Sequence, residues 1–324
     1  MILIISHAFD TITDLVMVWL KHLGAQCLRL DHPAANSVLS MQIGQQGNEI
    51  SLQVGDQSLP MDRVKKVWHR RAKLHLLPKA LQGSYSNREV ILNQLKKEED
   101  LVSETLEKWL RSKVDYMGSY IREKRNNLLD DLLLAQQVGL DIPATLVTGD
   151  QKQLLQFHNR YPKMISKSLL VPHLRDTKGR FYTKGTHLVD RQAIEALAPT
   201  FAPLLVQEYK EKSYELRVFI FKTRCHAMAI FSQNNEHSQI DCRKDNPKKP
   251  SRTVPFQLPQ KIEQQLLELM KLGDYDTGSI DLIVGPDGTF TFLEINPMGQ
   301  FLALSRSCNY YLDQQIAQYL SHAN

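Results

Sequence analysis

Residues 278–301 read GSIDLIVGPDGTFTFLEINPMGQF, and this stretch near the C-terminus is the most informative part of the sequence. Two apolar runs, residues 280–284 and 289–295, flank the tetrapeptide GPDG at residues 285–288. Proline fixes one backbone angle and glycine permits unusual ones, so GPDG is typical of a tight connection between strands. The stretch therefore predicts a β-hairpin.

The register of this hairpin decides which side chains share a face. If Val284 pairs with Thr289 across a four-residue loop, Asp281 lies opposite Phe292. Side chains alternate between the two faces of a strand, so three oxygen-bearing residues then lie together on one face. These are Asp281, Glu294 and Asn296.

This oxygen-bearing set has the chemistry of a magnesium site. Diagonal neighbours on such a ladder are roughly 7–8 Å apart, within the combined reach of an Asp and a Glu side chain. Mg²⁺ prefers oxygen ligands and takes its remaining ligands from water and substrate phosphates, so we expect a Mg-nucleotide. The alternative is a solvated polar strand face. Ile283, Phe290 and Phe292 are expected on the same face, which favours the floor of a pocket that also accepts an adenine ring.

The composition fits a chain with a large core. With 324 residues and 42% hydrophobic content, we expect two or three subdomains. No apolar run approaches the roughly 20 residues of a membrane span, and no signal peptide is recognisable, so we expect a cytoplasmic protein with no membrane partner. The four cysteines are scattered, which argues against zinc and disulfide frameworks. The net charge of +5 supports a nucleic-acid partner only weakly and suits an acidic peptide as well.

The N-terminal residues predict a β-α-β unit: a strand over 1–5, a helix over 14–23 and a second strand over 26–30. A G-x-G-x-x-G turn is missing from this stretch, so a dinucleotide-binding domain loses its main support. A strand over 64–68 runs into His69, Arg70 and Arg71. These residues suit a carboxylate or phosphate at the end of the strand, but a solvated loop is the more common interpretation.

Two passages resemble a known family. Asp281, Glu294 and Asn296, spaced as D-x(12)-E-x-N at the end of a hairpin, resemble the magnesium signature of the ATP-grasp ligases. A helix over 126–138 followed by Gly139 and a strand over 142–148 resembles the entry to the ATP-grasp core. The resemblance implies an α/β fold with α+β subdomains. It divides the chain into a pre-ATP-grasp domain (1–118), a central ATP-grasp subdomain (119–203) and a C-terminal ATP-grasp subdomain (204–324).

The resemblance also implies roles for individual residues. Arg217, Asp241 and Arg243 are the expected catalytic residues. The forked guanidinium of Arg217 suits phosphate oxygens, although a salt bridge to a neighbouring carboxylate is the simpler interpretation. Where relatives carry a first phosphate-binding lysine this chain has Asn127, so Lys124 or Arg125 is the expected substitute. The nucleotide is expected to contact Lys124, Lys167, Gln207, Glu208, Tyr209, Glu215 and Phe292, the last against the base.

The second half of the chain narrows the resemblance. Five motifs are similar to the peptide maturases of grasp-with-spasm systems, relatives of the microviridin synthetases that make graspetides: I-D-x-R (240–243), V-P-F-x-L-P (254–259), T-G-S-I-D-L-I (277–283), F-L-E-I-N-P-x-G-Q-F (292–301) and C-N-Y (308–310). This implies a homodimeric macrocyclase that uses ATP and two Mg²⁺ ions and binds a precursor peptide with a leader and an acidic core. Asp or Glu side chains would become acyl phosphates, which Ser, Thr or Lys side chains would attack to form ω-esters or ω-amides.

Two other functions remain open at this point. A RimK-like ligase that joins a free amino acid to a carboxylate would keep the same metal-binding and phosphate-binding residues. A noncatalytic nucleotide-binding or peptide-binding protein is the alternative from another class, and Asn127 in place of the lysine favours it slightly.

Overall fold

The structure is a computed structural model that describes residues 1–32, 37–54, 57–71, 88–169, 174–175, 181–182, 185–234 and 250–322. The chain forms two compact units. Unit 1 comprises Met1–Asn126, Tyr275–Thr277 and Gln300–Asn324, and unit 2 comprises Asn127–Asp274 and Gly278–Gly299. No helix in the described part of the chain combines the length and the apolar character needed to cross a bilayer.

Unit 1 is built on a parallel sheet with the strand order β2-β1-β6-β7. Its strands are β1 (Ile2–His7), β2 (Cys27–His32), β6 (Lys66–His69) and β7 (Asp115–Met117). The helix α1 (Thr11–His22) connects β1 to β2, which confirms the predicted β-α-β unit. Apolar side chains fill the strand β1, and all of them are buried. They are Ile2, Leu3, Ile4 and Ile5.

The remaining elements of unit 1 extend this core. A three-stranded antiparallel sheet packs its apolar side chains, including Ile50, Leu52 and Leu59, into one cluster with Leu3 and Ile5 of the parallel sheet. The other elements are β3 (Ser37–Gly44), β4 (Gly47–Val54), β5 (Gln57–Pro60), η1 (Met61–Arg63), α2 (Arg88–Arg111), α3 (Tyr120–Lys124), α8 (Leu302–Ser307) and α9 (Leu312–Ser321).

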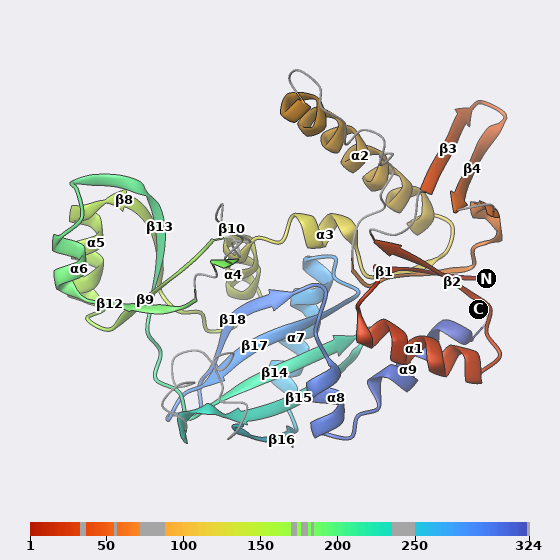
Figure 1. Cartoon of the computed structure of the whole chain (residues 1–324). Helices are drawn as coiled ribbons and strands as arrows, with labels where there is room; N and C mark the ends of the chain where they lie inside the picture. The colour runs from red at the N-terminus through yellow and green to blue at the C-terminus, as the bar shows by residue number, and fades with distance from the viewer. Residues whose placement is uncertain are drawn as a thin grey trace. The chain divides into compact units, whose positions relative to one another are not determined.

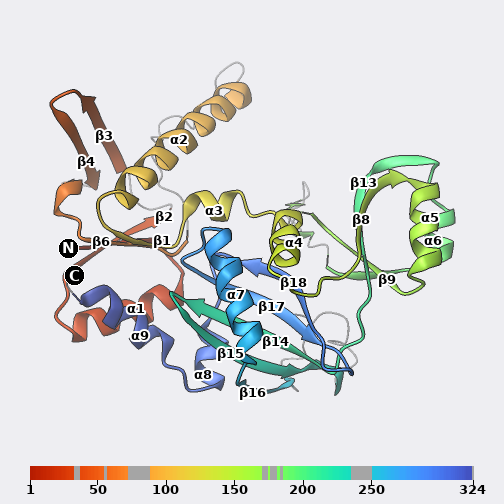
Figure 2. The ribbon, with the colours of Figure 1, turned by 180° about the vertical axis from the view of Figure 1, so that it is seen from behind.

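The C-terminal helix α9 belongs to unit 1 and packs along α1 (Figures 1 and 2). Trp19 Nε1 donates a hydrogen bond of 2.9 Å to Asp313 Oδ2, and Lys66 Nζ donates one of 2.7 Å to the carbonyl oxygen of Tyr319. Unit 1 therefore contains residues from the first part and from the last part of the sequence. The boundaries expected from the sequence instead divide the chain into three consecutive segments.

Unit 2 contains a four-stranded antiparallel sheet with the order β12-β9-β13-β8. Leu154, Met164, Ile194 and Val206 form the core between this sheet and its two helices. The elements are α4 (Leu128–Gln137), β8 (Thr145–Asp150), α5 (Gln151–Arg160), β9 (Met164–Lys167), β10 (Leu174–Arg175), β11 (Phe181–Tyr182), β12 (His187–Val189), α6 (Arg191–Glu195) and β13 (Thr200–Glu208). The side chain of Asn127 accepts a hydrogen bond of 3.0 Å from Leu129 N, so it caps the N-terminus of α4.

A five-stranded antiparallel sheet, in the order β16-β15-β14-β17-β18, completes unit 2. Figure 2 shows α7 lying across one face of it. The elements are β14 (Tyr214–Phe221), β15 (Arg224–Phe231), η3 (Ser232–Asn234), β16 (Arg252–Phe256), α7 (Gln260–Leu272), β17 (Thr277–Val284) and β18 (Phe290–Asn296). The hairpin β17–β18 confirms the prediction from residues 278–301, and Gly288 adopts a φ of +82° in its turn.

The hairpin register differs from the one expected. Val284 pairs with Phe290 instead of Thr289, and a bulge then changes the pairing so that Asp281 lies opposite Glu294 and Leu282 opposite Phe292. The prediction of Asp281 opposite Phe292 is therefore wrong, because the loop is one residue longer and β18 carries one extra residue.

The bulge changes which residues share a face. Ser279 lies opposite Asn296, so Asp281, Glu294 and Asn296 still lie on one face, as the sequence analysis expected from a different register. Phe290 and Phe292 lie on the other face with Val284 and Leu282, and the expectation that they share the carboxylate face is wrong. Phe292 is fully buried there, which is a core position.

One further cluster in unit 1 lies where β1 and β6 end. Arg70 is only 3% exposed, and its Nε lies 3.3 Å from Asp10 Oδ2, while His69 is buried against Tyr116. A solvated loop is therefore the wrong interpretation for these two residues, although Arg71 is exposed. Burial raises the pKa of the nearby Glu123 to about 6, against the opposing effects of Arg71 and Arg70.

Phe292→Ala should destabilise the protein strongly, because it empties a fully buried aromatic site. We expect the free energy of unfolding to fall by about 3–5 kcal/mol, measured by urea denaturation. Phe292→Leu, which keeps most of the volume, should cost less than half of that. Equal, small effects of both substitutions would contradict a core position for Phe292.

Glu123→Gln should stabilise the protein at neutral pH. A carboxyl pKa raised from 4.5 to about 6 means that the folded state prefers the protonated form. The stability that this preference contributes is complete below pH 4.5 and is lost as the pH rises through 6. At pH 7 the partly buried side chain is charged, which lowers the stability of the fold. A neutral glutamine avoids this cost, so it should raise the free energy of unfolding by about 1–2 kcal/mol at pH 7. Urea titrations at pH 7 and pH 4.5 would measure the difference. The same gain at both pH values, or an equal gain from Glu98→Gln on the exposed surface of α2, would contradict this cause.

Candidate nucleotide and metal site

Two acidic side chains on one face of the β17–β18 hairpin each pair with a basic side chain from another strand. Arg217, on the neighbouring strand β14, donates from Nε to Asp281 Oδ1 and from NH2 to Asp281 Oδ2, each at 2.9 Å. Lys167, at the end of β9, places Nζ 4.0 Å from Glu294 Oε2. The four side chains are 14–36% exposed, so the pairs are half-buried and accessible to a ligand. We call these four residues the acid–base tetrad.

A bound ligand could replace the ion pairs within the tetrad. Each carboxylate now faces a cation, so the salt bridge of Arg217 that was the simpler expectation does exist. A magnesium–triphosphate complex offers a cation to both carboxylates and phosphate oxygens to both basic groups. Binding would therefore replace two ion pairs with metal and phosphate contacts and leave none of the four charges without a counter-charge.

Asn296 supplies a third oxygen on this face. Its Oδ1 accepts a hydrogen bond of 3.0 Å from Met298 N, which holds the turn that ends β18. An amide oxygen has a second lone pair, so a metal contact is compatible with this bond. Within the described residues, no three His, Cys, Asp or Glu side chains gather as a metal site. A metal here would thus rely on Asp281, Glu294, this amide and oxygens from the ligand.

The segment expected to contact the adenine comprises the last two residues of β13 and the residue after it. Gln207 is 1% exposed and donates to Thr145 Oγ1 at 2.9 Å, Glu208 N donates to the Ala144 carbonyl oxygen at 2.9 Å, and Tyr209 N donates to that of Lys163 at 3.0 Å. These contacts hold the segment against the start of β8 and the loop before β9. The roles of Gln207, Glu208 and Tyr209 in nucleotide binding stay predictions.

The other expected nucleotide and catalytic residues pair with further side chains or lie outside the described chain. Glu215 is buried and accepts hydrogen bonds from Lys212 and, at 2.9 Å, from Ser232. Lys124 is in unit 1, where Nζ lies 2.8 Å from Asp100 Oδ2. The expected roles of both stay predictions. Asp241 and Arg243 lie outside the described residues.

The structure adds a residue that the sequence analysis missed. Asp141, just after α4, forms a parallel β-bridge with Thr291 on the edge strand β18. Its carbonyl oxygen accepts a hydrogen bond of 2.7 Å from Phe292 N. Its carboxylate accepts from Thr291 Oγ1 at 2.5 Å and lies 3.8 Å from Lys210 Nζ. Asp141 therefore fixes the strand that carries Glu294. An isolated Asp before an I-P dipeptide gives no sequence signal for such a contact.

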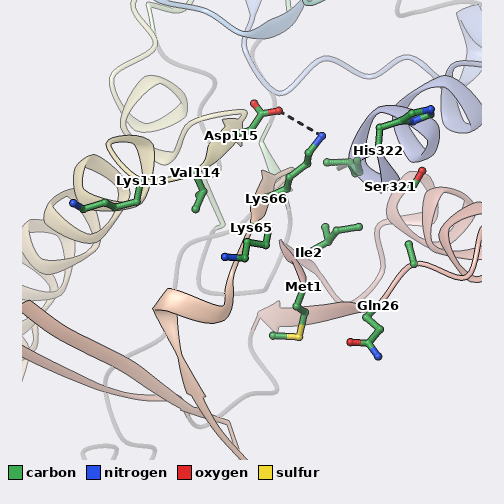
Figure 3. A pocket seen from close by; sticks show the side chains of 12 residues that line it. Met1, Ile2, Gln26, Lys65, Lys66, Lys113, Val114, Asp115, Ser321 and His322 are labelled. Atoms are coloured by element: carbon green, nitrogen blue, oxygen red, sulfur yellow. Dashed lines mark ion pairs between the residues drawn. The ribbon is translucent and has the colours of Figure 1, made fainter. Parts of the chain in front are cut away.

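A cavity of about 540 Å³ lies in unit 1 at the amino ends of the parallel strands (Figure 3). Met1, Gln26, Lys65 and Val114 line it, and Figure 3 shows the ion pair between Lys66 and Asp115 beside it. Open α/β sheets bind ligands at the carboxyl ends of their strands. This cavity is at the opposite edge, and we assign it no chemistry.

The chain is similar to known proteins in its N-terminal residues and in its overall fold. The family described as the MvdD pre-ATP grasp domain matches residues 1–117. The RiPP-associated ATP-grasp ligase of Chryseobacterium gregarium, solved with ADP and a leader and core peptide, shares 25% identity with a TM-score of 0.81, covering 99% of this chain and 95% of that chain. None of the curated proteins compared with the chain matches it.

Two further structures have the same fold. The macrocyclase MdnC from Microcystis aeruginosa MRC, bound with the precursor peptide MdnA, shares 28% identity with a TM-score of 0.80, covering 98% of each chain. The ATP-grasp ligase PsnB, complexed with a phosphomimetic variant of a minimal precursor, Mg and ADP, shares 20% identity with a TM-score of 0.70, covering 98% of this chain and 97% of that chain, and shows the fold alone.

These matches support the family resemblance that the sequence motifs indicate. The pre-ATP-grasp match covers residues 1–117. The structural matches extend over nearly the whole chain. The predicted resemblance is confirmed: the chain has the architecture of the ATP-grasp ligases that mature ribosomal peptides, with an N-terminal pre-ATP-grasp domain of the MvdD type.

Proposed function

We propose that the chain is an ATP-dependent, Mg²⁺-dependent macrocyclase that cross-links the side chains of a ribosomal precursor peptide. The acid–base tetrad is the observation that carries this proposal, because it provides ligands for a metal and for phosphates on one face. The likeness to ligases solved with ADP, leader and core peptides supports the choice of a peptide as substrate.

The proposed reaction has two steps. A carboxylate oxygen of a peptide Asp or Glu attacks the γ-phosphorus of ATP, and the bond to the bridging oxygen of ADP breaks. A Ser or Thr hydroxyl, or a Lys amine, of the same peptide then attacks the acyl carbon, loses its proton and displaces inorganic phosphate. Each ring therefore removes one water from the peptide, and one ATP becomes ADP and phosphate.

Each tetrad residue has a defined part in this reaction. Asp281, Glu294 and Asn296 would hold Mg²⁺, which neutralises the triphosphate and the charge that develops on the transferred phosphoryl group. Arg217 and Lys167 would bind the phosphate oxygens, with the forked guanidinium of Arg217 spanning two of them. Asp281 and Glu294 lie directly opposite each other, an arrangement that suits the two ions that the family resemblance implies.

The partners follow from the same resemblance. The proposed substrate is a precursor with a leader segment and an acidic core, and the net charge of +5 suits an acidic peptide. The proposal also includes a homodimer, and it includes neither a nucleic acid nor a membrane.

Incubation of the enzyme with Mg-ATP and a precursor encoded beside it should lower the mass of the peptide by one water per ring. Mass spectrometry measures this, and Asp281→Asn should abolish it because the carboxylate that binds the metal is lost. Unchanged mass with amino-acid-dependent release of ADP would indicate a RimK-like ligase instead. ATP binding without peptide-dependent release of ADP would indicate a noncatalytic protein.

Arg217→Lys should separate nucleotide binding from catalysis. A lysine can still pair with Asp281 but cannot span two phosphate oxygens, so kcat for ring formation should fall about 10²–10³-fold while the Kd for Mg-ADP changes little. Arg224→Lys, at an exposed position of the neighbouring strand β15, is the matched control and should leave kcat unchanged. Full turnover by Arg217→Lys would exclude the phosphate contact.

A further inference from the structure

The sheet of unit 1 has a topological switch point that the proposed chemistry does not use. The strand order is β2-β1-β6-β7, and the chain leaves β1 toward β2 but leaves β6 toward β7. The two connections therefore diverge at the carboxyl ends of β1 and β6. Ligands of open α/β sheets bind in the crevice at such a point.

Two arginines are fixed at this switch point. The backbone N–H groups of Arg70 and Arg71 both donate to the carbonyl oxygen of Ile5 on β1, at 2.9 and 3.2 Å. The loop that leaves β1 adds Phe9, whose side chain is 86% exposed. The switch point thus offers basic groups and an exposed aromatic side chain from adjacent strand ends.

The two arginines have different environments. Arg70 is buried, pairs with Asp10 and lies 5.5 Å from the ring centroid of Phe301, so its contacts fix the loop. Arg71 is exposed. With the Gln300 amide turned so that its oxygen faces Arg71, this oxygen accepts hydrogen bonds of 3.1 and 3.0 Å from NH1 and NH2. The two terminal nitrogens of Arg71 thus share one neutral oxygen, whereas a carboxylate would offer each of them an oxygen of its own.

Two acidic side chains, Asp10 and Glu123, lie near the arginines of the switch point. Asp10 is committed to Arg70 and to the first turn of α1, where its Oδ1 accepts from Ile12 N. Glu123 faces both arginines, but burial outweighs their attraction and its pKa lies near 6. Glu123 is still mostly ionised at pH 7 and attracts both arginines, while the terminal nitrogens of Arg71 donate to the neutral oxygen of Gln300. A carboxylate from outside would gain two charge-assisted hydrogen bonds in place of bonds to an amide.

We propose that Arg71 binds a carboxylate of the acidic precursor peptide at the switch point between β1 and β6. This inference rests on the proposed function for the choice of a peptide, and it adds a recognition residue in unit 1. The methylene groups of an Asp or Glu side chain suit an apolar neighbour such as Phe9, which free phosphate would not use.

The test measures peptide binding without ATP. Fluorescence anisotropy of a labelled precursor should show a Kd about tenfold higher for Arg71→Ala than for the wild type. Arg71→Lys keeps the charge but loses the fork and should fall between the two. Arg63→Ala, which removes another exposed arginine of unit 1, should bind as the wild type does. Equal thermal midpoints and an unchanged Kd for Mg-ADP would show that each variant is folded.

A double-mutant cycle identifies the carboxylate. Each Asp or Glu of the precursor is changed in turn to Asn or Gln, and one of these peptides should bind the wild type and Arg71→Ala equally. Losses that add for every peptide would overturn the inference, as would unchanged binding by Arg71→Ala or a wild type that does not bind the precursor. Displacement of the peptide from Arg71 by millimolar inorganic phosphate would instead assign a phosphate site.

The same experiments separate this inference from the proposed macrocyclase activity. Ring formation is read from the mass of the peptide and depends on the tetrad in unit 2, whereas the Kd is measured without nucleotide. Water loss with unchanged binding by Arg71→Ala would refute this inference alone. Arg71-dependent binding without water loss would refute the macrocyclase alone.

Discussion

The direct pairing of Asp281 with Glu294 is the constraint on which the candidate site depends. Two carboxylates that face each other across a hairpin repel unless cations lie close by. Arg217 from β14 and Lys167 from β9 supply those cations. The five-stranded sheet must therefore place β14 beside β17, and the end of β9 must reach β18. A ligand that brings both a divalent cation and an anion satisfies the same four charges.

The surrounding structure preserves this arrangement. The bulge in β18 brings Glu294 opposite Asp281 and sends Phe292 into the core, while Asp141 holds the outer edge of the same strand through Thr291. Gly299 closes the turn after Asn296 with a φ of +41°, and a Cβ there would lie 2.9 Å from the ring of Phe219. Packing on one face of the hairpin thus determines the positions of the polar groups on the other.

Local patterns gave the hairpin, the β-α-β opening and the three oxygen-bearing residues on one face, because alternation and turn residues act within a few positions. They did not give the register, since the extra residue in β18 has no turn signal, and so Phe292 was placed on the wrong face. The sequence shows that Asn127 stands where relatives carry a lysine, but only the structure shows that its side chain caps α4. The ion pair of Arg70 with Asp10 and the packing of α9 on α1 join distant segments, which periodicity cannot predict.

Binding of a magnesium–nucleotide complex should replace the Arg217–Asp281 and Lys167–Glu294 ion pairs with metal and phosphate contacts. A crystal structure with Mg²⁺ and a non-hydrolysable ATP analogue would show this. We expect Mg²⁺ at about 2.0–2.1 Å from oxygens of Asp281 and Glu294, with Arg217 and Lys167 on the phosphates. An intact Arg217–Asp281 salt bridge, with the nucleotide bound elsewhere, would contradict it.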